Sequence, residues 1–118
     1  MGTRSITIFL DEEDTEIAVL YRQYDGYIEG HGKELRNFLK NKEIINGISI
    51  KKQQTKDNSF NGMANLAANT IAHFAGALGN FYLYPPNTRN IGEDYIYIIS
   101  GKVGDKEATV TIKDYNIG

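Results

Sequence analysis

A chain of 118 residues, with 41% hydrophobic and 24% charged residues, has the size and composition of one soluble domain with a single core. Its net charge of −2 argues against DNA or RNA binding, which needs a basic surface. The absence of cysteine excludes disulfides and thiolate chemistry. No apolar run reaches membrane-spanning length and the first residues lack an apolar signal core, so we expect a cytoplasmic protein that binds no membrane.

The first forty residues predict a β-hairpin followed by a short helix. Apolar residues alternate over 4–10 and again over 15–22, and the charged residues 11–14 between them predict the turn. Leu35, Phe38 and Leu39 form the i, i+3, i+4 stripe of a helix over 32–40. The second strand ends at Arg22, so we expect its side chain to lie beside the loop that enters the helix.

That loop, within residues 21–32, is rich in glycine and tyrosine and lies between a strand end and a helix start. The unpaired N–H groups of a first helical turn attract anions, which predicts a phosphate or nucleotide site. The alternative is a tight turn pinned by aromatic rings, and two acidic residues in the loop would oppose an anion. The candidate ligand-binding residues here are Arg22, Tyr24, Gly26 and His31.

The middle of the chain predicts a turn and a second helix. Residues 43–50 carry an Asn46-Gly47 turn between apolar pairs, and 51–58 read as a polar loop. A helix over 61–78, capped by Ser59 or Asn61 and stopped at Gly79-Asn80, is apolar almost all round. Such a helix is normally buried, and one small sheet cannot cover it. We therefore expect it to lie at the interface of a homodimer or higher homo-oligomer.

Residues 81–84, 93–100 and 106–114 predict three further strands, the first ended by Pro85-Pro86. Strand alternation places Ile96 and Ile98 on the core side of the sheet. It predicts a tyrosine patch on the other side, with polar side chains in the adjoining loop, formed by Tyr82, Tyr84, Tyr95 and Tyr97. Rings beside an arginine and amides suit a purine base, whereas the alternative is cross-strand tyrosine pairs that only stabilise the sheet or a subunit contact. The candidate residues in this part are Tyr82, Tyr84, Arg89 and Asn90.

The element order β-β-α-α-β-β-β over 1–118 predicts one α+β domain, with a curved antiparallel sheet packed around two helices. The two histidines fall in different elements, and no metal-ligand spacing, hydrolase elbow or P-loop lysine motif is present. We therefore expect no enzyme: no catalytic residue, no metal and no cofactor.

Several segments together carry a resemblance to a known family: Met1–Ser5, Tyr21–Tyr27, Gly30–Gly32, Asn61–Met63 and Tyr82–Pro85. In this order they resemble the Thoeris anti-defence proteins of phages and bacteria, the cyclic-ADP-ribose sponges. The resemblance implies an oligomer that holds a cyclic ADP-ribose isomer made by TIR-domain immune proteins, of glyco-cyclic type, without cleaving it. Some members also bind cyclic oligonucleotides at a second site.

The resemblance further implies that aromatic rings stack on the base and that arginines contact the phosphates. The positions that match are Arg22, Tyr24, Tyr82, Tyr84, Arg89 and Asn90. Two other functions remain open: an enzyme that hydrolyses a cyclic nucleotide signal, and an inhibitor that binds a protein and no small ligand.

Overall fold

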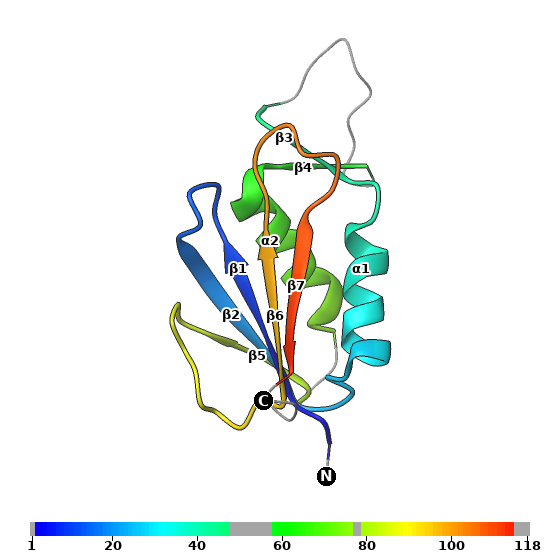
Figure 1. Ribbon diagram of the computed structural model, residues 1–118, viewed down its shortest axis with the longest axis vertical. Coiled ribbons are helices and arrows are strands. Elements are labelled where there is room, and N and C mark those ends of the chain that lie inside the picture. The colour runs from blue at the N-terminus through cyan, green and yellow to red at the C-terminus, as the bar shows by residue number, and fades with distance from the viewer. Residues whose placement is uncertain (1, 48–57, 77–78, 115–118) are drawn as a thin grey trace.

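The computed structural model describes residues 2–47, 58–76 and 79–114, and it has the expected α+β class (Figure 1). Five strands form one sheet in the order β5-β2-β1-β6-β7. Their bounds are β1 (Ser5–Leu10), β2 (Glu16–Arg22), β5 (Phe81–Tyr84), β6 (Tyr95–Ser100) and β7 (Thr109–Asp114). A separate two-stranded sheet pairs β3 (Glu43–Ile45) with β4 (Ser59–Asn61) in parallel.

The predicted hairpin forms the middle of the sheet. β1 pairs with β2 in antiparallel fashion across the turn at 11–14, where the Asp11 carboxylate accepts the N–H groups of Glu13 and Thr15. β1 lies between β2 and β6, and both of its faces are buried rather than one, because the helices cover one side of the sheet and loop residue Ile91 packs on the other. Ile6 and Ile8 are buried on one face of the sheet, and Phe9 is buried on the other.

The expectation of a purely antiparallel sheet is wrong, because β1 and β6 are parallel. β5 is antiparallel to β2, and β2 to β1, so β5 runs in the same direction as β1. Loop 85–94 therefore has to return the chain past two strands before β6 begins. Ile91 of this loop packs on a cluster formed by Ile6, Ile8, Val19, Tyr21 and Ile96. We call this side of the sheet the outer face.

Both helices cover the opposite side, the inner face (Figure 1). A π-helical turn, η1 (Ile28–Gly32), leads directly into α1 (Lys33–Leu39), and α2 is Gly62–Phe74. The helices and the inner face bury a continuous core that includes Phe9, Leu20, Leu35, Leu39, Leu66, Phe74, Tyr97 and Ile99. α2 is buried along one side, and Ala64, Ala68 and Ala72 on its other side are exposed. The interface expected on α2 stays a prediction.

The ends of α2 differ from the prediction. The helix ends at Phe74 rather than at 78, and residues 77–78 lie outside the described part of the chain. Asn61 is at the N-cap position without a capping hydrogen bond from its side chain. Instead the Glu12 carboxylate, in the hairpin turn, accepts the Met63 N–H at 2.7 Å. A carboxylate from a distant turn therefore satisfies a donor of the first helical turn.

The Asn46-Gly47 turn expected in the middle segment is followed by residues 48–57, which lie outside the described part, as does most of the predicted polar loop. The described strand before the turn pairs with β4, a partner that the sequence pattern did not indicate. The Gly47 N–H donates to the Asn61 side chain at 2.7 Å. Gly47 has a φ of 83°, a conformation that favours glycine.

Candidate functional site

Arg22 and His31, the two expected cationic groups of the glycine-rich loop, are both buried under the inner face. The Arg22 guanidinium donates to the Tyr24 carbonyl at 2.7 Å and to the Glu34 carboxylate at 2.7 Å. It also contacts His31 Nδ1 at 3.2 Å and lies 5.0 Å from the centre of the Phe81 ring. These contacts fix the end of β2 to the start of α1. Arg22 is therefore engaged within the fold and is not positioned as the expected phosphate ligand.

The contacts of His31 determine its charge and its tautomer. A guanidinium only donates, so Nδ1 accepts from Arg22 and Nε2 carries the proton. Nε2 then donates to the Thr7 hydroxyl at 2.7 Å. Burial, and next the adjacent Arg22 charge, lower the pKa of His31 to about 3. His31 is therefore a neutral, buried residue whose two ring nitrogens have partners within the fold, and its expected role in ligand binding stays a prediction.

The backbone of the loop is closely packed against the start of β1. A Cβ added to Gly26 would lie 2.8 Å from the Ser5 Cβ and the Ser5 backbone. The Gly26 carbonyl accepts the hydroxyl of buried Tyr97 at 2.6 Å. Gly26 is therefore needed for packing rather than for approach to a ligand. Tyr24 is 52% exposed, beside Gly2, and is the only one of the four loop candidates that solvent reaches to this extent.

The tyrosine patch expected on one face is divided between two. Tyr97 is fully buried on the inner face, with the ring of Tyr95 stacked 6.4 Å away. Tyr82 and Tyr84 lie instead on the outer face, where both rings contact Tyr21. The prediction placed the wrong side of β6 toward the helices. Both sides of β6 are apolar enough to be buried, so alternation alone did not distinguish them.

Arg89 and Asn90 shape the crossover loop. The Arg89 guanidinium forms a two-point ion pair with Glu16, with distances of 2.7 and 3.2 Å, and this contact lowers the pKa of Glu16. Asn90 has a φ of 59°, and its N–H donates to the buried Glu93 carboxylate at 3.0 Å. Both residues hold the loop over the outer face. The structure does not direct either of them at an open site.

The aromatic cluster that does reach solvent consists of Tyr21, Tyr82 and Tyr84, and we call it the outer tyrosine cluster. The Tyr21 ring centre lies 6.0 Å from that of Tyr82 and 6.1 Å from that of Tyr84, the latter edge to face. The Tyr21 hydroxyl donates to the Gln23 side chain at 2.9 Å. Tyr82 is 45% exposed, and its hydroxyl donates to the Gly79 carbonyl at 3.1 Å.

Arg4 adds a positive charge to this face and was not among the predicted site residues. It precedes β1 by one residue, and alternation places it on the side of Ile6 and Tyr21. A Cβ added to Gly92 would lie 2.9 Å from Arg4 Nη1, so the crossover loop crosses the arginine side chain closely. Arg4 Nε is buried, and among the described residues it has no hydrogen-bond acceptor. Its strand parity was the signal that could have identified it.

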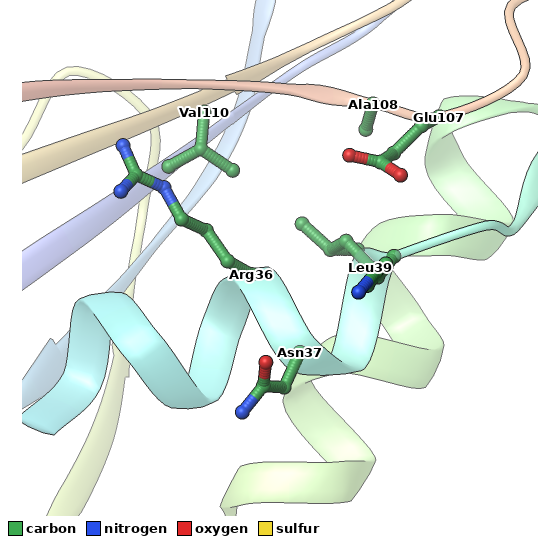
Figure 2. Close-up of a pocket in the computed structure, with 7 residues that line it drawn as sticks. Arg36, Asn37, Leu39, Glu107, Ala108 and Val110 are labelled. Atoms are coloured by element: carbon green, nitrogen blue, oxygen red, sulfur yellow. The ribbon is translucent and has the colours of Figure 1, made fainter.

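A pocket of about 220 Å³ lies elsewhere, between α1 and the segment that enters β7 (Figure 2). Leu39, Ala108 and Val110 give it apolar walls. Arg36 and Lys40 bring positive charge, and Glu107 accepts the Asn41 N–H at 2.9 Å. None of the predicted site residues lines it. Among the described residues there is no group of three side chains that could hold a metal ion.

Comparison of the chain with protein-family models, with curated proteins and with solved structures found no match. None of the helices in the described part of the chain is both long enough and apolar enough to cross a membrane. The functional proposal below therefore rests on the arrangement of Arg4 and the outer tyrosine cluster and on the motif resemblance. Of the eight predicted residues, the structure brings only Tyr82 and Tyr84 together on an exposed aromatic surface.

Proposed function

We propose that this protein binds and sequesters a cyclic ADP-ribose isomer of the glyco-cyclic type without cleaving it, and so inhibits TIR-based (Thoeris) antiphage defence in the bacterial cytoplasm. The observation that carries the proposal is the combination of Arg4 with the outer tyrosine cluster. A buried guanidinium nitrogen that has no acceptor among the described residues lies on the same face as Tyr21 and the two rings that pack on it, one of them 45% exposed. The motif resemblance supplies the ligand class.

The chemistry of the two groups matches a purine nucleotide with phosphates. A buried donor without an acceptor is unfavourable until a partner arrives, so a phosphate oxygen beside Arg4 would relieve that penalty. The exposed ring of Tyr82 can stack on the base, and such stacking contributes about 1–3 kcal/mol. Tyr84 would support the platform through its edge-to-face contact with Tyr21.

This assignment moves the phosphate-binding role from Arg22 to Arg4. Arg22 donates to three groups of its own chain, so binding a phosphate would require breaking the contacts that join β2 to α1. Arg89 is likewise held by Glu16. Arg4 lies on the outer face, near enough to Tyr21 for its charge to act on the tyrosine hydroxyl. We propose that the phosphate of the ligand binds Arg4 while its base stacks on the tyrosine rings.

Binding without cleavage is favoured by the state of His31. It is buried, its two ring nitrogens are engaged by Thr7 and Arg22, and its pKa of about 3 keeps it neutral. This histidine cannot exchange protons with a ligand on the outer face. An enzyme that hydrolyses the cyclic ligand on this face would need other side chains, such as carboxylates, as its acid and base. A protein–protein inhibitor would bind no small ligand at all.

A capture experiment separates the three functions. The protein is incubated with a glyco-cyclic ADP-ribose isomer, freed of unbound ligand by gel filtration, and then heat-denatured. We expect mass spectrometry of the supernatant to find the intact cyclic molecule in near-stoichiometric amount. Release of linear ADP-ribose instead would identify an enzyme. Recovery of no nucleotide, for any cyclic isomer offered, would favour the protein–protein inhibitor.

A further inference from the structure

β5 forms an open edge of the main sheet, and its side chains leave that edge unusually accessible. It pairs with β2 on one side and has no strand on the other among the described residues. Its sequence, Phe-Tyr-Leu-Tyr, contains neither charge nor proline. Leu83 is 62% exposed and Tyr82 is 45% exposed. Natural sheets usually protect such edges with charged residues, prolines or covering segments.

The pairing with β2 defines which backbone groups of β5 point outward. The Gln23 N–H donates to the Asn80 carbonyl at 2.8 Å, one step beyond the Arg22–Phe81 pair. Hydrogen-bonded pairs alternate along an antiparallel ladder, so Tyr82 and Tyr84 direct their backbone groups toward β2. Phe81 and Leu83 therefore direct their N–H and C=O groups toward the open edge.

We propose that a second copy of this chain pairs with β5 across a two-fold axis that passes beside Tyr82. In this antiparallel register Phe81 of one protomer lies opposite Leu83 of its partner, and the reverse. The four outward N–H and C=O groups of each strand then find their partners in four interchain hydrogen bonds. Each exposed Leu83 side chain packs beside Phe81 of the other protomer on the inner face.

A second copy satisfies all the outward groups at once and also pairs each exposed Leu83 with an apolar Phe81, which is why we propose a copy as the partner. When the contact is centred on Tyr82, Phe81 of each copy pairs with Leu83 of the other. A two-fold axis perpendicular to the sheet then keeps α2 of both protomers on the same face of the joined sheet. The other edge strand, β7, ends in Lys113 and Asp114 and thus carries the charges that discourage such pairing. The pairing does not depend on the proposed ligand.

Disulfide trapping tests this register directly, because the chain has no native cysteine. In Tyr82→Cys the two cysteines face each other across the axis as a non-hydrogen-bonded pair, with a Cα separation of about 4.5 Å that permits a disulfide. In Leu83→Cys they are two positions out of register, about 8 Å apart, which is too far. Val103→Cys, in an exposed turn, serves as the control.

We expect the ligand-free Tyr82→Cys protein to form a covalent dimer under mild oxidation at least about tenfold faster than either other variant. A Tyr82→Cys rate no greater than that of Val103→Cys would overturn the proposal, as would faster trapping through Leu83→Cys. Both outcomes are read on ligand-free protein, so they leave the proposed nucleotide binding unaffected.

Light scattering gives the second measurement. We expect the parent chain to be a dimer at about 100 μM, a concentration at which even weak specific pairs are populated. Leu83→Lys should raise the dissociation constant about tenfold or more, with an unchanged circular dichroism spectrum, while Val103→Lys should not. A parent chain that is monomeric at this concentration, or a Leu83→Lys protein that stays fully dimeric, would contradict the proposed edge pairing.

Discussion

At the residue scale, Arg22 and His31 are held in place by each other. Arg22 donates hydrogen bonds to the Tyr24 carbonyl, the Glu34 carboxylate and the His31 ring. The His31 ring in turn donates a hydrogen bond to the Thr7 hydroxyl on the central strand. A chain of hydrogen bonds therefore runs from α1 through β2 to β1. Arginine and histidine often bind phosphates at protein surfaces. Here Arg22 and His31 are buried and hydrogen-bond to each other instead.

The first prediction concerns the stability provided by Arg22. Arg22→Ala leaves the Tyr24 carbonyl and His31 Nδ1 without their donor, and it removes the partner of Glu34. Glu34 is half exposed and can be rehydrated, so we expect a loss of about 2–4 kcal/mol in the free energy of unfolding. Urea denaturation measures it. Arg36→Ala, which removes an exposed arginine from α1, the helix that carries Glu34, should change this energy by less than about 0.5 kcal/mol. Equal stability of the two variants would show that the Arg22 network is not stabilising.

The second prediction concerns pH. The folded-state pKa of His31 is about 3, below the value of about 6.5 in the unfolded chain, so only the unfolded state takes up a proton as pH falls below 6.5. The stability is thus complete above pH 6.5 and decreases toward pH 3. Between pH 7 and 5 we expect the parent to lose about 2 kcal/mol that His31→Gln does not lose.

Urea denaturation of both proteins at each pH measures this difference, and proton NMR of the His31 ring gives a check on the folded parent alone. The ring shifts should stay constant from pH 7 to 5. A titration of the His31 ring with a midpoint near 6.5, or parallel pH profiles for parent and variant, would contradict a buried neutral imidazole.

At the element scale, the regular periodicities of the sequence were informative and the long-range contacts were not. The structure confirms the hairpin and the helix around Leu35. Both could be predicted because the spacing of their apolar residues matches the period of one secondary structure only. β6 has apolar side chains on both faces, so its orientation depends on which neighbours cover it. The parallel pairing of β1 with β6, and the capping of α2 by Glu12, join residues far apart in the chain. No local pattern encodes either contact.

The candidate site was predictable to the same degree. Tyr82 and Tyr84 were found because tyrosines in an edge strand are conspicuous in the sequence. Arg22, the arginine expected from the sequence, ends its strand on the face that the helices cover, whereas Arg4, the residue before β1, lies on the opposite face. Which face the helices cover is a tertiary property. The sequence therefore suggested which residue types to consider but not the side of the sheet on which they lie, and their role in binding stays a prediction.

The third prediction tests the packing of the turn that precedes η1. A methyl group at Gly26 would lie 2.8 Å from backbone and side-chain atoms of residues 4 and 5, so the start of β1 must shift. We expect Gly26→Ala to lower the free energy of unfolding by about 1–3 kcal/mol. Gly76 provides the matched control: apart from its chain neighbours, no atom of the described residues lies within 4 Å of its Cβ position, so Gly76→Ala should be nearly neutral. Calorimetry that finds similar melting temperatures for the two variants would contradict the close packing.

At the scale of the whole molecule, the crossover loop gives the two faces of the sheet different roles. The inner face is covered by helices, while on the outer face, among the described residues, loop 85–94 lies over the strands and Tyr82 stays 45% exposed. The buried Nε of Arg4 belongs to this outer face as well. The open β5 edge borders this outer surface through Tyr82. The proposed ligand site and the proposed protomer contact therefore meet at Tyr82. Its ring is the proposed stacking surface for the base, and across the two-fold axis it faces Tyr82 of the second copy.

The most direct measurement is a calorimetric titration of a glyco-cyclic ADP-ribose isomer into the parent chain, Arg4→Ala and Arg36→Ala, with linear ADP-ribose as the competing ligand. We predict that the cyclic isomer binds the parent much more tightly than the linear one. Loss of the charged donor in Arg4→Ala should weaken binding by about one to two orders of magnitude, and Arg36→Ala should bind like the parent. A folded Arg4→Ala protein with the affinity of the parent, or linear ADP-ribose bound as tightly as the cyclic isomer, would contradict the account.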